Sequence, residues 1–326
     1  MAATAVTPEV LDLDILREMY RGGAISLAGI DPRLNVTRIA RRLKVGRARV
    51  DARLQAWKKS GFLRRYEVWV NPALFGWEGA FVAIRVEDRR EKSKLMPCLG
   101  LVDGIVSGTE FLGEWITVGL IAPDAASLER RVALIRELPG VREVESPTRW
   151  HVPRPKRALT SLDLRIIRSL RERPMATLGE TAHRAGVSTR TMTRRYSELI
   201  EGWAVWFVPL FDFRSISYPV VTIGVTVRPG VRAAGIAHSI RARFPLTLDL
   251  PATQAAPDVG GETQVWIVIP PSAAHLEEIE QFVESIDGVV SVEANVMVRV
   301  HSFPEWFDDH LRTLMKGRSE TTRVAR

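Results

Sequence analysis

The chain has 326 residues, 46% of them hydrophobic, which is enough for two or more globular domains with cores of their own. A formal net charge of +8 and a pI near 10.0 favour a polyanionic partner, and the single cysteine, Cys98, excludes an intramolecular disulfide and a cysteine-rich zinc site. The start of the chain lacks a secretory signal pattern and no stretch is apolar enough to span a membrane, so a soluble, cytoplasmic protein without a membrane partner is expected.

The first predicted unit, residues 8–72, has the pattern of a winged helix-turn-helix. Apolar residues recur at helical spacing from Val36 to Leu43 and again from Val50 to Trp57, on either side of a turn at Val45-Gly46. An alternating run at 62–70 then predicts a strand or wing. This order is typical of DNA-binding heads, whose second helix enters the major groove.

The outer faces of these predicted elements are rich in arginine and lysine. Arginines near the start of the second helix can bridge guanine bases, and the remaining cations can clamp phosphates. The residues expected to contact DNA in this unit are Arg41, Arg42, Lys44, Arg47, Arg49, Arg53, Arg64 and Arg65. The competing interpretation of each is a solvated surface charge.

Residues 73–153 alternate strand and helix patterns in the order βαββαβ, which predicts a ferredoxin-like domain. Strands are expected at 80–86, 104–111, 115–121 and 141–152, and helices at 92–101 and 125–138. A ligand pocket between this domain and a second one is a further hypothesis, with Phe111, Gly113, Trp115 and Trp266 as its candidate residues. Packing in the core is the alternative for the aromatic members.

The second half of the chain repeats this plan after a linker at 153–156. Leu162-Asp163-Leu164 echoes Leu11-Asp12-Leu13, and Ser161 and Ser188 are expected to cap helices. Residues 158–212 form the second predicted winged helix-turn-helix, 213–304 the second ferredoxin-like domain and 305–326 a basic tail, disordered from Lys316 onward. In the second domain, strands are expected at 220–227, 246–253, 263–269 and 289–300, and helices at 233–244 and 273–286.

The second head is less basic, but its predicted recognition helix also offers polar and basic groups to DNA. These residues are Ser188, Thr189, Arg190, Thr191, Arg194 and Arg195. The fold class predicted is therefore α+β, with two tandem copies of a winged helix-turn-helix and a ferredoxin-like domain. The two copies are expected to pack on each other as a pseudo-dimer within the chain, and exposed sheet edges can recruit further chains into a homo-oligomer.

Motifs of catalysis are missing from the sequence. The six histidines form no HxH or HExxH pattern, and neither a phosphate-binding GxxxxGK[ST] loop nor a GxSxG elbow occurs. His151 and His301 each follow the last predicted strand of a domain, where a surface histidine is the ordinary interpretation. A protein that is not an enzyme and holds no metal or cofactor is expected.

Several short motifs resemble the Lrp/AsnC, or feast/famine, family of transcriptional regulators. They are Leu11-Asp12 with Ile15-Leu16, Asn71-Pro72, and Leu138-Pro139-Gly140-Val141. The resemblance implies a sequence-specific transcriptional regulator that binds double-stranded DNA and responds to a small-molecule effector through its α+β domains. Residues 113–116 and 260–263 lack the aspartate that the family usually has between the middle strands, which puts amino-acid sensing in doubt.

An alternative follows from the same resemblance. Siroheme decarboxylases are similar to this family in architecture and are built from paired Lrp-like modules, so a tandem chain can be a tetrapyrrole enzyme of that type. The arginine-rich helix after Gly46 favours the regulator, because a decarboxylase has no need of a basic helix face.

Overall fold

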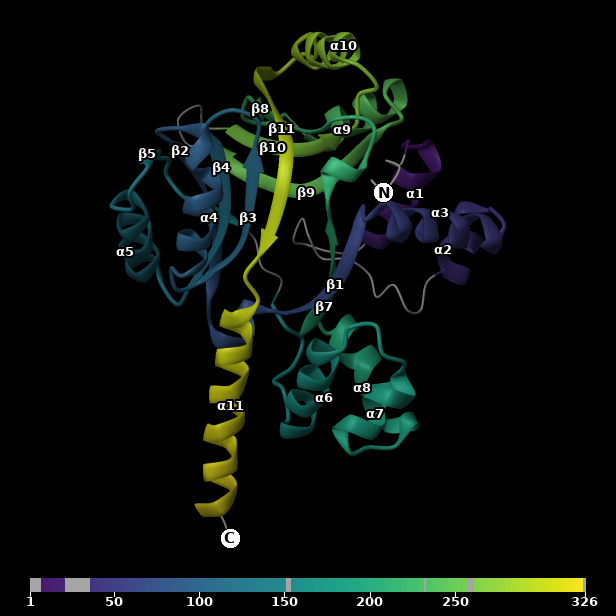
Figure 1. Ribbon diagram of the computed structural model, residues 1–326, viewed down its shortest axis with the longest axis vertical. Helices are drawn as coiled ribbons and strands as arrows, with labels where there is room; N and C mark the ends of the chain where they lie inside the picture. Colours follow the sequence, from purple (N-terminus) through teal and green to yellow (C-terminus); the bar gives the residue numbers. More distant parts are fainter. Residues whose placement is uncertain (1–6, 21–35, 151–153, 232, 257–260, 325–326) are drawn as a thin grey trace.

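A computed structural model describes residues 7–20, 36–150, 154–231, 233–256 and 261–324 (Figure 1). It confirms the α+β fold with two helix-turn-helix heads and two ferredoxin-like bodies. We call residues 10–60 head 1, 78–150 body 1, 161–201 head 2 and 220–302 body 2.

Each head consists of three helices followed by a strand. Head 1 contains α1 (Val10–Tyr20), α2 (Val36–Leu43) and α3 (Arg47–Ser60), and head 2 contains α6 (Ser161–Glu172), α7 (Leu178–Ala185) and α8 (Thr189–Glu201). The strands β1 (Leu63–Val70) and β7 (Val205–Phe211) pair with each other in an antiparallel ribbon, with Trp69 opposite Trp206. The loop expected at 22–32 lies outside the described residues.

Each body follows the predicted βαββαβ order. Body 1 contains β2 (Glu78–Val86), α4 (Lys92–Gly100), β3 (Ile105–Phe111), β4 (Trp115–Ala122), α5 (Ala125–Arg136), β5 (Val141–Val144) and β6 (Thr148–Trp150). Body 2 contains β8 (Val220–Val227), α9 (Ala233–Arg243), β9 (Thr247–Ala256), β10 (Gly261–Val268), α10 (Ala273–Glu284) and β11 (Val289–Ser302). Short 3-10 helices lie at η2 (Pro72–Phe75), η3 (Arg89–Glu91) and η4 (Phe213–Ser215). The single strand expected at 141–152 is divided into β5 and β6.

The two bodies share one antiparallel sheet. Its strand order is β5-β2-β4-β3-β11-β8-β10-β9, and the seam between the bodies is the β3–β11 pair, in which Thr109 lies opposite Val300. At the far ends β6, which pairs with β2, lies beside β9, so the sheet curls until its two outer regions meet. One face carries the helices and their apolar cores, because residues such as Ile84 and Ile223 point toward them. The opposite face of the sheet encloses a space between the two bodies.

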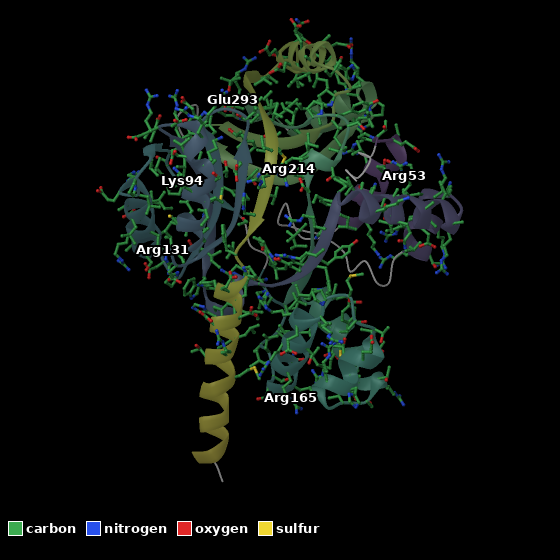
Figure 2. All side chains as sticks on the ribbon, viewed as in Figure 1. Arg53, Lys94, Arg131, Arg165, Arg214 and Glu293 are labelled. Atoms are coloured by element: carbon green, nitrogen blue, oxygen red, sulfur yellow. The ribbon has the colours of Figure 1, made fainter. Side chains whose placement is uncertain are left out.

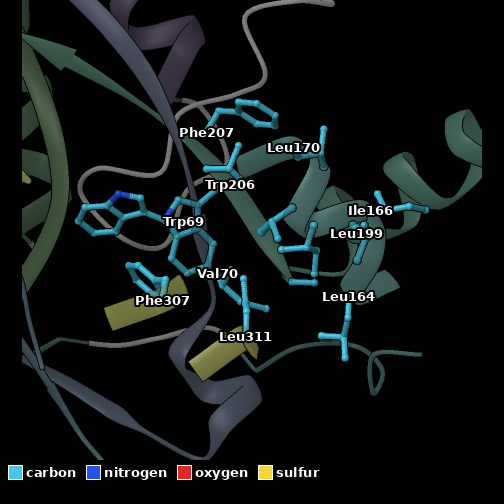
Figure 3. Close-up of a cluster of buried hydrophobic side chains, with 14 of the residues drawn as sticks. Trp69, Val70, Leu164, Ile166, Leu170, Leu199, Trp206, Phe207, Phe307 and Leu311 are labelled. Carbon is cyan, nitrogen blue, oxygen red and sulfur yellow. The ribbon is translucent and has the colours of Figure 1, made fainter. Parts of the chain in front are cut away.

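Each head packs on the body of the other half of the chain. The core of head 1 continues into body 2 through Val220 and Ile269. The core of head 2 continues into body 1 through Val106 and Ile121, and Trp69 of β1 joins it beside the helices of head 2 (Figure 3). Burial of a large apolar side chain contributes about 1.5–3 kcal/mol, so these shared cores hold the halves together.

The end of the chain differs from the sequence expectation. Residues predicted as a basic tail, disordered from Lys316, form the helix α11 (Glu305–Val324), which projects away from the bodies (Figure 1). Trp306, Phe307 and Leu311 are buried in the core of head 2. These apolar residues anchor the helix, whereas the expectation rested on the polar composition that follows them.

Two helix-start details also differ. Thr160, and not Ser161, caps α6, because its side chain accepts from the backbone N–H of Asp163 while Asp163 accepts from that of Thr160. In head 1 the left-handed turn residue is Lys44, with φ of 55°, while Gly46 is extended and is the N-cap of α3. Ser188 caps α8 as expected.

Candidate functional site

The space enclosed by the sheet is a cavity of about 550 Å³ between the two bodies. Alternate residues of a strand point to opposite faces, so one set of positions on each strand lines the cavity and the other set packs under the helices. Ligand pockets commonly measure about 300–1,000 Å³, so this cavity is large enough for a sizeable organic molecule.

The walls of the cavity are aromatic and hydroxyl-bearing, with two acidic groups. The aromatic residues are Phe81, Phe111, Trp115, Phe211 and Phe213, and the hydroxyl residues are Ser107, Thr109, Thr117, Ser146, Thr222 and Thr263. The acidic residues are Glu145 and Glu293. Aromatic faces of this kind stack on flat conjugated rings, and the hydroxyl groups can hydrogen-bond polar substituents.

The four candidate ligand-binding residues do not all meet here. Phe111 and Trp115 line the cavity. Gly113 lies in the β3–β4 turn with φ of 90° and outside the lining. Trp266 does not belong to the site, because it is buried in the core of body 2 while its neighbours Val265 and Ile267 face the cavity.

Lys92 fixes the hairpin that presents the two aromatic candidates. Its ammonium group donates to the backbone carbonyls of Phe111 at 2.7 Å and Trp115 at 2.9 Å. Burial lowers the pKa of Lys92, and the nearby carboxylates of Glu110 and Glu114 oppose that shift. The lysine therefore ties α4 to both ends of the β3–β4 turn.

The acidic residues occupy the same place in each copy. Glu145 stands five residues after Gly140, and Glu293 stands five residues after Gly288, both glycines having a positive φ. Partial burial raises the pKa of Glu145, and the charges of Glu293 and then Glu143 raise it further. Both glutamates remain exposed to water, and Figure 2 shows Glu293 on β11. No motif marked them in the sequence, although their common spacing from the repeated glycine was visible there.

A second polar group lies at the seam, on the helix side of the sheet. Nε2 of His301 lies 2.6 Å from Oε1 of Glu110, and Arg299 lies 3.6 Å from the same oxygen. Burial lowers the pKa of His301, and the hydrogen bond that its ring donates to Glu110 partly opposes that shift. His301 shares a sheet side with Gly108, which contacts Met96 of α4, so it does not line the cavity. His151 lies outside the described residues.

Two of the predicted DNA contacts are committed to internal ion pairs. Arg53 donates to Asp12 through Nε at 2.7 Å and also binds Glu9, which leaves its side chain 18% exposed (Figure 2). The pKa of Arg53 is raised by its hydrogen bond to Asp12. Arg195 at the equivalent place in head 2 lies 3.1 Å from Glu198 and 3.9 Å from Asp163. Both arginines brace a recognition helix against the first helix of its head and are not free to contact bases.

The other predicted contacts lie mostly at the surface. Arg42 binds Glu18, Arg65 binds Glu67, Arg47 lies 3.4 Å from Asp51, and Arg194 lies 4.0 Å from Glu198. The exposed residues of the set are Arg41, Arg42, Lys44, Arg47, Arg49, Arg64, Arg65, Ser188, Thr189, Arg190 and Arg194, whereas Thr191 is half-buried. The more basic exposed face is that of head 1.

Other sites are weaker. A shallow polar hollow of about 510 Å³ lies on head 2, lined by Glu172, Arg173, Glu180, His183 and Arg184. It has no aromatic wall, so the cavity between the bodies is the better candidate. Within the described residues, no three His, Cys, Asp or Glu side chains are grouped as metal ligands, and no helix is long and apolar enough to cross a membrane.

Comparison with known proteins gives structural matches alone. No family model and no curated protein matches this sequence. The crystal structure of the siroheme decarboxylase NirDL is similar over 95% of this chain and 100% of that one, with a TM-score of 0.53 and 15% identity. The structure of NirDL in complex with an iron-uroporphyrin III analogue is similar over 94% of this chain and 100% of its own, with a TM-score of 0.52 and 14% identity. AsnC from Escherichia coli covers 47% of this chain and 99% of its own, with a TM-score of 0.31 and 17% identity.

These matches correct one expectation from the sequence. The prediction that the chain is not an enzyme is wrong, because the structures that match it over nearly its whole length are those of an enzyme. The prediction rested on the basic charge of the helix after Gly46. Part of that charge belongs to Arg53, which forms an internal ion pair with Asp12.

Proposed function

We propose that this protein is a decarboxylase that acts on a carboxylated tetrapyrrole inside the cavity between its two bodies. The observation that carries the proposal is the cavity itself, which lies in a fold shared over 95% of the chain with a siroheme decarboxylase. A related structure of that enzyme holds an iron-uroporphyrin III analogue.

The chemistry of the lining supports this class of substrate. Phe111, Trp115 and Phe213 offer flat apolar surfaces to a conjugated macrocycle. Glu145 and Glu293 place negative charge in the same space, which disfavours a substrate carboxylate and favours its conversion to neutral carbon dioxide. Binding energy from the macrocycle would offset that repulsion.

The test is binding and turnover with iron-uroporphyrin III as the probe. The full chain should shift the visible absorbance of the tetrapyrrole, and mass spectrometry should detect products that have lost carbon dioxide. Ala83→Trp, which places a large ring in the cavity, should abolish both signals. Leu134→Trp, on the exposed outer side of α5, is the matched control and should leave both unchanged. Binding that survives Ala83→Trp would contradict the proposed site.

We also propose, as a second function, that head 1 binds duplex DNA. The observation that favours it is the exposed group of Arg41, Lys44, Arg47 and Arg49 on α2 and α3. Replacing Arg47 and Arg49 with alanine should weaken binding to a random duplex and reduce the slope of its salt dependence by about 2, because two phosphate or base contacts are lost. Arg190→Ala with Arg194→Ala in head 2 gives the comparison, and equal affinities of all three proteins would reject the idea.

A further inference from the structure

The duplication places one carboxyl group from each copy at a single cavity. Glu145 follows β5 of body 1 and Glu293 lies on β11 of body 2, each at the same distance along the chain from a left-handed glycine. The backbone N–H of Glu145 donates to Ala83 at 3.0 Å, and Glu293 is paired with Gly224. Ala83 and Gly224 also line the cavity, and neither carries a side chain larger than a methyl group beside the two glutamates. The two acids are therefore equivalent groups brought together by the repeat.

The charges around this pair are few in the described part of the chain. Glu143 lies two residues before Glu145, and Arg85 of β2 is opposite Glu143 in the β2–β5 pair. Arg85 is held by Glu114 at 2.8 Å and lies 4.0 Å from Glu143. No ion pair joins Glu145 or Glu293 to a cation among the described side chains, so no salt bridge offsets the charge that Glu293 places near Glu145. Two carboxylates that share a site cannot both ionise easily, and one of them keeps its proton to a higher pH.

We infer that Glu145 and Glu293 form a carboxyl pair that holds one proton and delivers it to the carbon from which carbon dioxide leaves. This inference rests on the proposed decarboxylase function, and it identifies the carboxyl pair as the general acid of that reaction. The substrate group is a carboxymethyl side chain. The bond between its methylene carbon and its carboxylate carbon breaks, and the electron pair stays on the methylene carbon.

The proton of the pair then moves from a glutamate oxygen to that carbon. The products are a methyl group and carbon dioxide, and water returns a proton to the pair. No oxidant or reductant takes part. The remaining negative charge of the pair repels the substrate carboxylate before reaction, and this repulsion disappears when neutral carbon dioxide forms.

The test uses Glu145→Gln and Glu293→Gln in the full chain, with Glu137→Gln as the control. Glu137 is an exposed acid at the end of α5 and lies away from the cavity. Each cavity variant should lower turnover of iron-uroporphyrin III at least about 100-fold, while the dissociation constant stays equal or falls, because a general acid and a repulsive charge are removed together. The double variant should be no slower than either single one, since the pair acts as a unit.

A titration without substrate separates this inference from the proposed function. With ¹³C-labelled glutamate, the carboxyl pKa of Glu145 should fall when Glu293 is replaced and should not change in the Glu137 variant. Turnover by either cavity variant at the wild-type rate, or an unchanged Glu145 pKa in Glu293→Gln, would overturn the inference. If the wild-type protein neither binds nor converts the tetrapyrrole but the titration succeeds, the proposed function fails and the carboxyl pair stands.

Discussion

The two heads share a buried brace between their first and third helices. In head 1, Asp12 accepts from Arg53 and from the indole N–H of Trp57 at 3.0 Å. In head 2, Asp163 is fully buried and accepts from Arg157 at 2.7 Å, with Arg195 close by. The acid thus sits at the same point of the repeated Leu-Asp-Leu motif in both heads, although the cations around it differ.

The turns of the two heads differ more than their braces. Lys44 has φ of 55° at the place where head 2 has Gly186 with φ of 67°. The N-cap of α3 is Gly46, which makes no side-chain hydrogen bond, whereas the N-cap of α8 is Ser188, which does. The same fold is reached with better local signals in head 2. The comparison teaches that the apolar stripe and the buried acid set the geometry of a head, while turn and cap residues adjust its stability.

The largest expected effect comes from removing the acid of a brace. Asp163→Ala should destabilise head 2 by about 1.5–3 kcal/mol, because it removes a fully buried carboxylate that accepts hydrogen bonds from Arg157 and Thr160. Asp12→Ala should have a comparable effect on head 1, since in both heads the arginines keep a second carboxylate, Glu9 in head 1 and Glu198 in head 2. Hydrogen exchange of the α8 and α3 amides measures the two losses separately.

A surface ion pair provides the control for this comparison. Arg168→Ala removes an exposed pair with Glu172 on α6 and should cost about 0.5 kcal/mol or less. A loss in Asp163→Ala no larger than that of Arg168→Ala would show that the brace does not stabilise the head.

Acid should weaken head 2 through the same carboxyl group. Burial raises the pKa of Asp163, but hydrogen bonds from Arg157 and Thr160 outweigh it and lower the pKa to about 2, against 3.8 in the absence of these partners. The resulting stabilisation, about 2 kcal/mol, is complete above pH 4 or so and is lost as the pH falls through 3.8 toward 2. The stability difference between wild type and Asp163→Asn should therefore shrink as the pH falls from about 4 to about 2. A difference that is constant over this range would refute the assignment.

Exchanging the turn residues should have the smallest effect. Lys44→Gly should stabilise head 1 by about 1 kcal/mol, and Gly186→Lys should destabilise head 2 by about 1–2 kcal/mol, because a side chain is disfavoured at positive φ. A Cβ at Gly186 meets no atom within 4 Å, so the cost is one of backbone conformation alone. Chemical unfolding, combined with hydrogen exchange of the amides in each head, measures whether each variant gains or loses stability. Changes of the same sign in the two heads would contradict the explanation.

Local patterns in the sequence were sufficient for the elements of the fold. The alternating run at 220–227 is β8 with the same limits, and the apolar stripe from Val50 to Trp57 lies on α3. The cavity depends instead on the β3–β11 seam and on the meeting of β6 with β9, which join residues far apart in the chain. No local pattern encodes such pairings. Arg53 was misassigned for the same reason, because its partner Asp12 lies 41 residues away.

The exchange of heads between the two halves has a consequence for how the protein is made. When a ribosome has released only the first half, Trp69 and Val106 lack the side chains of head 2 that cover them, and head 1 lacks Val220 and Ile269. The first half therefore exposes apolar surface, which chaperones can bind, until translation of the second half is nearly finished. A gene cut at the 153–156 linker would have to supply both polypeptides together, and neither fragment should accumulate alone as a folded protein.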